Sequence, residues 1–152
     1  SENKNKNQKS IINIDLENIK TKKTEAPSDW SQDLNRYELE IKRLGFNKEE
    51  ENSLIKELIG YNSRNMIIDY DDLLLMIKII KTTKDNKSVI QIKEFYSKDN
   101  LIKETNHILS ELKWNTEKAR KVVYDFYKVK SRNELSQKQL IEFYFFLLQK
   151  AA

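Results

Sequence analysis

The chain contains one helical pattern twice. The stretch FNKEEENSLIKELIGYNSRN (residues 46–65) matches WNTEKARKVVYDFYKVKSRN (residues 114–133) in register and without a gap. Each copy begins with an aromatic residue followed by Asn, ends in Ser-Arg-Asn, and keeps its apolar positions in the same phase. A repeat that preserves this phase predicts a repeated helical unit, and two copies are too few for a solenoid. We therefore expect two related units that pack as one bundle or are joined by a connector.

Apolar residues recur at three- and four-residue steps, which is the pattern of amphipathic helices. Helix ends are predicted at Gly45 and Gly60, because glycine adopts the left-handed conformation that closes a helix. Helix starts are predicted at Asn47, Asn115 and Ser136, the first and last of which have Glu or Gln three residues later, as in a capping box. With only 2 Gly and 1 Pro in the chain, few turns are available for a β-rich fold. The sequence predicts an all-α protein with three helices in each unit.

Composition along the chain predicts four parts. Residues 1–28 are polar and rich in Lys and Asn, so they bury too little apolar surface to offset their ordering entropy and form a predicted flexible tail. Residues 29–83 form the first unit and residues 97–152 the second. Residues 84–96 form a connector that contains SVIQIKEFY, a stretch consistent with strand or helix, for which we favour helix.

Nothing in the sequence points to a membrane or to an oxidising compartment. The chain has no Cys, so disulfides and thiolate metal sites are excluded. It has no apolar run of about 18 residues, and its first residues lack the apolar core of a signal peptide. We predict a cytoplasmic protein. The apolar cluster IINIDLENI, residues 11–19, is either a motif that docks on a protein partner or a local cluster that straps the chain's own core.

The sequence offers little for catalysis. The single histidine, His107, has no Cys and no second His with which to share a metal. The acidic run from Asp69 to Asp72 has oxygen ligands for a divalent cation, but its place at a helix start favours capping. A glycine-rich phosphate loop is absent. We predict that the protein is not an enzyme and uses no metal or cofactor.

Charge differs between the two units. Residues 29–83 hold 8 basic and 11 acidic side chains, a net charge of −3, whereas residues 97–151 hold 11 basic and 7 acidic, a net charge of +4. Basic surfaces interleaved with aromatic residues are typical of proteins that contact phosphates and stack bases. The alternative is a solvated helix with Trp114 in the core. The predicted nucleic-acid-binding residues are Lys113, Lys118, Arg120, Lys121, Lys128, Lys130 and Arg132.

The Ser-Arg-Asn tripeptide occurs in both the acidic and the basic unit, which argues against a phosphate-binding role common to both copies. A structural role is favoured, in which Ser and Asn bond the linker backbone and Arg bonds helix-end carbonyls or a carboxylate. Any nucleic-acid function then lies in the helix that precedes the tripeptide. The predicted structural linker residues are Ser63, Arg64, Asn65, Ser131 and Asn133.

Residues 112–147 contain a longer pattern, made up of Trp114, Glu117, Ala119, Arg120, Tyr127, Ser131, Arg132, Leu135, Ser136, Gln139, Leu140 and Phe143. This pattern resembles a helical module found at the C-termini of cyanobacterial proteins, including recombination proteins of the single-strand-annealing type. The Lys-, Asn- and Ile-rich composition is also similar to that of small marine cyanobacteria. The module has glycine where this chain has Lys128, so the turn there is in question. The first copy keeps Gly60, Ser63 and Arg64 but lacks the equivalents of Trp114 and Arg120.

These observations together predict a non-catalytic nucleic-acid-binding protein whose second unit is the contact surface. The resemblance implies an auxiliary role in DNA recombination or a related DNA transaction, and single- or double-stranded DNA is the expected partner. The alternative function is a protein–protein adaptor. It would dock through the apolar third helices, such as LIEFYFFLL in the second unit, or through residues 11–19.

Overall fold

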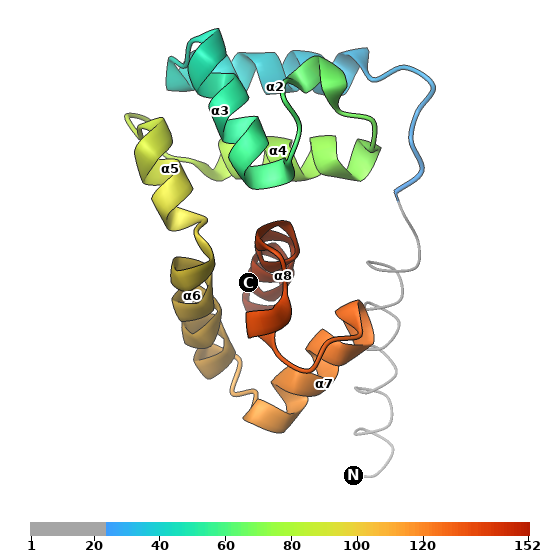
Figure 1. Cartoon of the computed structure of the whole chain (residues 1–152), viewed down its shortest axis with the longest axis vertical. Helices are drawn as coiled ribbons and strands as arrows, with labels where there is room; N and C mark the ends of the chain where they lie inside the picture. The colour runs from blue at the N-terminus through green and yellow to red at the C-terminus, as the bar shows by residue number, and fades with distance from the viewer. Residues whose placement is uncertain (1–23) are drawn as a thin grey trace.

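The computed structural model describes residues 24–152, and every regular element in this part of the chain is helical (Figure 1). The elements are α2 (Ser31–Leu44), α3 (Lys48–Ile59), the 3-10 helix η1 (Arg64–Met66), α4 (Tyr70–Thr82), α5 (Val89–Phe95), α6 (Lys98–Glu111), α7 (Thr116–Tyr127), the 3-10 helix η2 (Arg132–Glu134) and α8 (Gln137–Ala151). The all-α prediction is confirmed, and the favoured helix in the connector is α5. Residues 1–23, which hold most of the predicted tail and all of the 11–19 segment, lie outside the described residues.

The order helix, helix, 3-10 helix, helix occurs twice. Helix α3 begins at Lys48 and α7 at Thr116, 68 positions later, and both helices have 12 residues. The third helices α4 and α8 begin 67 positions apart, at Tyr70 and Gln137, so the first copy has one extra residue before its third helix. We refer to α2–α4 as the first half and to α6–α8 as the second half. The division of the chain into separate units stays a prediction.

The helix ends explain why these segments fold as they do. The side chain of Asn47 accepts from the backbone N–H of Glu50, and Ser136 forms the same capping box with Gln139. Both glycines adopt the predicted left-handed conformation, with φ 74° at Gly45 and 85° at Gly60. The predicted caps are therefore confirmed.

The second half has no glycine at these two left-handed positions. Counting 68 residues on from Gly45 and Gly60 leads to Lys113 and Lys128, which both have φ 59°. The turn geometry in question at Lys128 is thus kept without glycine. Lysine is strained in this conformation, whereas glycine is not.

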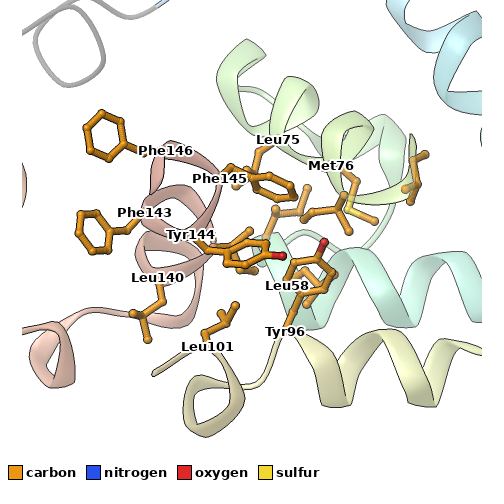
Figure 2. Close-up of a cluster of buried hydrophobic side chains, with 14 of the residues drawn as sticks. Leu58, Leu75, Met76, Tyr96, Leu101, Leu140, Phe143, Tyr144, Phe145 and Phe146 are labelled. Carbon is orange, nitrogen blue, oxygen red and sulfur yellow. The ribbon is translucent and has the colours of Figure 1, made fainter. Parts of the chain in front are cut away.

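The two halves share one hydrophobic core. Figure 1 shows the first half at one end of the molecule and α7 at the other, with α5 and α6 along one side and α8 between them. Helix α2 packs along α4 and α6 along α8, while α3 contacts α4, α5 and α8. Tyr96, next to α5, contacts Tyr144 and Phe145 of α8 with ring centroids 6.3 and 6.1 Å apart (Figure 2). Aromatic side chains of α8 therefore join the second half to the connector.

The third helices are buried. The apolar residues of α8 from Leu140 to Leu147 are at most 9% exposed, and among the large apolar side chains of this helix only Leu148, at 38%, reaches solvent appreciably. In α4, the side chains of Leu73, Met76, Ile79 and Ile80 are fully buried. The third helices thus form the core and leave little apolar surface for a docking partner. Among the helices of residues 24–152, none has the length and apolar content that crossing a bilayer requires.

Candidate nucleic-acid interface

Two of the predicted contact residues, Lys121 and Lys128, share one face of α7 and its C-cap with Tyr124, which was not among the predicted residues. Lys121, Tyr124 and Lys128 are spaced by three and four residues, so they lie on the same side of the helix. Tyr124 is 53% exposed, and the ammonium of Lys128 lies 5.4 Å from the centroid of its ring. The Lys121 ammonium is 3.0 Å from the Asp125 carboxylate. We call Lys121, Tyr124 and Lys128 the α7 face, which presents an aromatic ring between two cations.

The other predicted lysines are more scattered. Lys118 stands over the ring of Trp114, with its ammonium 4.7 Å from the ring centroid, and Trp114 itself is half-buried against the core. Lys113 and Lys130 are exposed. The backbone N–H of Lys130 donates to the Glu134 carboxylate at 2.8 Å. Trp114 is therefore mainly a packing residue, which agrees with the alternative prediction that it belongs to the core.

Arg132 is half-buried, and its guanidinium is bonded to α6. Its guanidinium donates to the backbone carbonyl of Ile102 at 3.3 Å and to the Thr105 hydroxyl at 2.5 Å. It also donates to the side-chain carbonyl of Asn106 at 2.5 Å. These three groups belong to α6, so Arg132 ties the linker between α7 and α8 to that helix. Arg120, in contrast, is exposed.

The matching Arg64 of the first half has a different environment. Its Nε and Nη2 each donate to one carboxylate oxygen of Glu51 at 2.7 Å, which is the paired geometry that arginine and carboxylate favour. Its Nη1 donates to Glu38, and the guanidinium lies 4.8 Å from the ring centroid of Tyr37. Glu51 is 1% exposed, and sequence analysis did not single it out. A local signal for its burial is its position, four residues before the apolar Ile55.

The remaining linker residues have smaller roles. Ser63 and Ser131 have extended backbone immediately before the two 3-10 helices. The Glu134 carboxylate accepts from the backbone N–H of Ser131 at 3.2 Å. Asn65 and Asn133 are exposed, and their side chains form no hydrogen bond with another described residue. The ordering of both linkers thus depends more on the arginines than on the Ser and Asn side chains.

The residues considered for metal binding have other partners. Asp69 caps α4 by accepting from the backbone N–H of Asp71, as the capping interpretation predicts. The Asp72 carboxylate accepts from the Tyr61 hydroxyl at 2.6 Å and from the Lys138 ammonium at 2.9 Å. The His107 side chain is exposed and lies 3.0 Å from the Glu111 carboxylate. Within residues 24–152, no group of three or more His, Cys, Asp or Glu side chains is placed to hold a metal ion.

The stability of the protein is expected to depend on the charge of Glu51. Burial raises the pKa of this carboxyl, but the favourable interactions with Arg64, Tyr37 and Lys48 together outweigh burial and lower the pKa below its ordinary value of 4.5. A lowered pKa in the folded state stabilises the protein above pH 4.5, and this contribution is lost as the pH falls through the folded-state pKa. Urea unfolding from pH 7 to pH 3 measures it as the difference between the native protein and Glu51→Gln. The difference should shrink below about pH 4.5, and a constant difference would contradict the assignment.

The chain was compared with protein families, curated proteins and solved structures. No protein-family model, no curated protein and no solved structure matches the chain.

Proposed function

We propose that the protein binds nucleic acid without catalysis and that the α7 face is its main contact surface. The observation that carries this proposal is Tyr124, an exposed aromatic ring flanked on one helix face by Lys121 and Lys128. The lysines suit contacts with phosphates, and the tyrosine suits stacking on an unpaired base. A role in DNA recombination or a related DNA transaction is implied by the resemblance of residues 112–147 to the cyanobacterial module.

The charge distribution supports the same surface. Residues 97–151 carry a net charge of +4, and Lys113, Arg120 and Lys130 add exposed cations to those of the α7 face. Arg132 is given a supporting role, because its guanidinium is bonded to α6. Binding is therefore expected to be dominated by phosphate contacts and to weaken as salt increases.

Reversing two charges on the α7 face is expected to weaken this binding. In Lys121→Glu/Lys128→Glu, affinity for a fluorescently labelled oligonucleotide should fall at least tenfold at about 50 mM salt, because two phosphate contacts are lost. The slope of log affinity against log salt should decrease in magnitude by about 2, or about 1 for each lysine. Fluorescence anisotropy with single- and double-stranded oligonucleotides measures both quantities.

A matched control separates local contacts from net charge. Lys56→Glu/Lys81→Glu changes the net charge by the same amount at exposed positions of the first half. This variant should lose less than about threefold in affinity, because distant surface charges are screened. If the two variants lose the same affinity, the α7 face is not the contact surface. If the native protein shows no salt-sensitive binding, the proposal fails.

Replacing Tyr124 by alanine distinguishes the expected partners. A stacked base contributes about 1–3 kcal/mol, so Tyr124→Ala should weaken single-stranded binding at least fivefold if the ring stacks on a base. Double-stranded binding should change little, because paired bases are not available for stacking on this ring. Equal losses for both substrates would show that Tyr124 contributes only to the shape of the surface.

The adaptor function receives less support. The apolar side chains of α4 and α8 belong to the core, so the third helices offer no extended apolar face. Docking through residues 11–19 concerns a segment outside the described residues and stays a prediction.

A further inference from the structure

A cavity of about 350 Å³ lies between α6, the start of α7 and the linker that carries Arg132. Arg120 and Arg132 line it, together with the polar side chains of Asn106 and Asn133. Its apolar wall includes Trp114 and three smaller side chains, which are Leu109, Ala119 and Val123. None of the described residues that line it is acidic. The Arg132 pocket, as we call it, therefore presents two guanidinium groups without a carboxylate.

In the first half, side chains fill the space beside Arg64, the residue that matches Arg132. Arg64 has three side-chain partners, namely the ring of Tyr37 and the carboxylates of Glu38 and Glu51. These groups surround the guanidinium and neutralise its charge. In the register of the repeat, 68 positions later, their counterparts are Thr105, Asn106 and Ala119.

These three differences remove both charge and volume. The change from Tyr37 to Thr105 removes an aromatic ring, and the change from Glu51 to Ala119 removes the carboxylate that bonds Arg64 through two atoms. At the remaining position, an amide replaces the second carboxylate. The second half therefore has an open cavity at the place where the first half has a buried arginine–carboxylate pair.

The pKa values of the two arginines also reflect the carboxylate present in the first half and missing from the second. The pKa of Arg64 is raised, first by its hydrogen bonds to Glu51. The pKa of Arg132 is lowered, because burial removes water from a guanidinium that has no neighbouring carboxylate. Both Nη atoms of Arg132 bond neutral groups of α6, and its Nε donates to no described residue. A half-buried cation in this state favours a nearby anion.

We propose that the Arg132 pocket binds an oxyanion group, a carboxylate or a phosphate, in the place that the Glu51 carboxylate occupies beside Arg64. The anion accepts from Arg132 and from Arg120 at the pocket edge, and the apolar wall accommodates the carbon skeleton of a small ligand. The source is either a free small anion or the terminal phosphate of a nucleic acid. This inference does not depend on nucleic-acid binding by the α7 face.

The two tryptophans provide a test in the whole 152-residue chain. Trp114 lines the pocket, whereas Trp30 lies in the first half against Tyr70, so their indole N–H signals in an NMR spectrum serve as reporter and control. Titration with inorganic phosphate, and separately with acetate, is carried out at constant pH and at an ionic strength held constant with chloride. The Trp114 signal should shift and saturate with at least one of these anions, while the Trp30 signal stays in place. A shift that does not saturate with either anion would overturn the proposal.

Restoring the missing carboxylate should close the site. In Ala119→Glu, the new side chain is expected to pair with Arg132 as Glu51 pairs with Arg64, so the affinity for the titrated anion should fall at least tenfold. If Ala119→Glu does not fold, Asn106→Glu places the carboxylate at an exposed position and serves the same purpose. The proposal would be overturned if Ala119→Glu, or Asn106→Glu in its place, folds and binds the anion as tightly as the native protein does.

The source of the anion is decided by oligonucleotides with and without a 5′-phosphate. A terminal phosphate is the ligand if the phosphorylated oligonucleotide shifts the Trp114 signal and the unphosphorylated one does not, and if Ala119→Glu abolishes that shift. A free small anion is the ligand if inorganic phosphate or acetate shifts the signal and neither oligonucleotide does. The Lys121→Glu/Lys128→Glu variant should still bind the small anion in the Arg132 pocket. This result would support anion binding by the pocket whether or not the protein binds oligonucleotides through the α7 face.

Discussion

Replacing Glu51 with alanine is expected to lower the free energy of unfolding by about 3–5 kcal/mol, because Arg64 loses the carboxylate that bonds two of its nitrogens and keeps the more exposed Glu38. Glu51 is 1% exposed and bonds the guanidinium through both carboxylate oxygens. Glu38, the other acidic partner of Arg64, is partly exposed. It bonds Nη1 and therefore cannot replace the Glu51 carboxylate, which bonds Nε and Nη2. Chemical denaturation followed by circular dichroism measures the loss.

Two further variants show whether this loss comes from the ion pair. Glu49→Ala removes an exposed carboxylate from the same turn of α3 and should change stability by no more than about 0.5 kcal/mol. Glu51→Ala/Arg64→Met removes both charges and should recover much of the stability, because apolar pairs often replace buried ion pairs at little cost. If Glu51→Ala and Glu49→Ala lowered the free energy of unfolding by the same amount, the Glu51–Arg64 pair would not be a principal stabilising contact.

Replacing Phe143 with alanine is expected to have a comparable effect, a loss of about 3–5 kcal/mol, because it leaves a cavity in the shared core. The Phe143 side chain is fully buried in α8 (Figure 2). Its ring lies 6.3 Å from that of Phe126 and 6.1 Å from that of Phe146, measured between centroids. The same denaturation experiment measures this loss.

Phe143→Leu is the conservative comparison. It keeps most of the volume, so the loss should be clearly smaller than that for alanine. Tyr124→Ala removes an aromatic ring from the exposed α7 face and should have little effect on stability. Equal losses for Phe143→Ala and Tyr124→Ala would contradict the burial of Phe143.

Local signals in the sequence were enough to predict most of the helices. Asn47 and Ser136 start helices because their side chains satisfy backbone N–H groups at the first turn, and that chemistry depends only on residues three positions away. The phase of the apolar residues identified the buried faces in the same way. The short connector was ambiguous from its pattern alone, and its own capping box, Ser88 with Gln91, was not recognised.

The candidate sites depend on contacts between distant parts of the chain, and these were harder to predict. The partners of Arg132 lie 26 to 30 residues earlier, on α6, and no local pattern indicates them. Glu51 resembles its neighbours in an acidic run, so its burial could not be separated from theirs by composition. One signal was available in the sequence, because the register of the repeat already aligns Glu51 with Ala119 and thereby indicates a carboxylate missing from the second copy.

The two lysines in left-handed conformation have a consequence for protein engineering. Lys113 and Lys128 occupy the places of Gly45 and Gly60, so each carries a backbone penalty that a glycine would relieve. A programme that selected only for thermal stability would favour glycine at both positions. It would also remove two cations from the basic half, one of them on the α7 face. Selection for stability and retention of the basic surface thus oppose each other at these two residues.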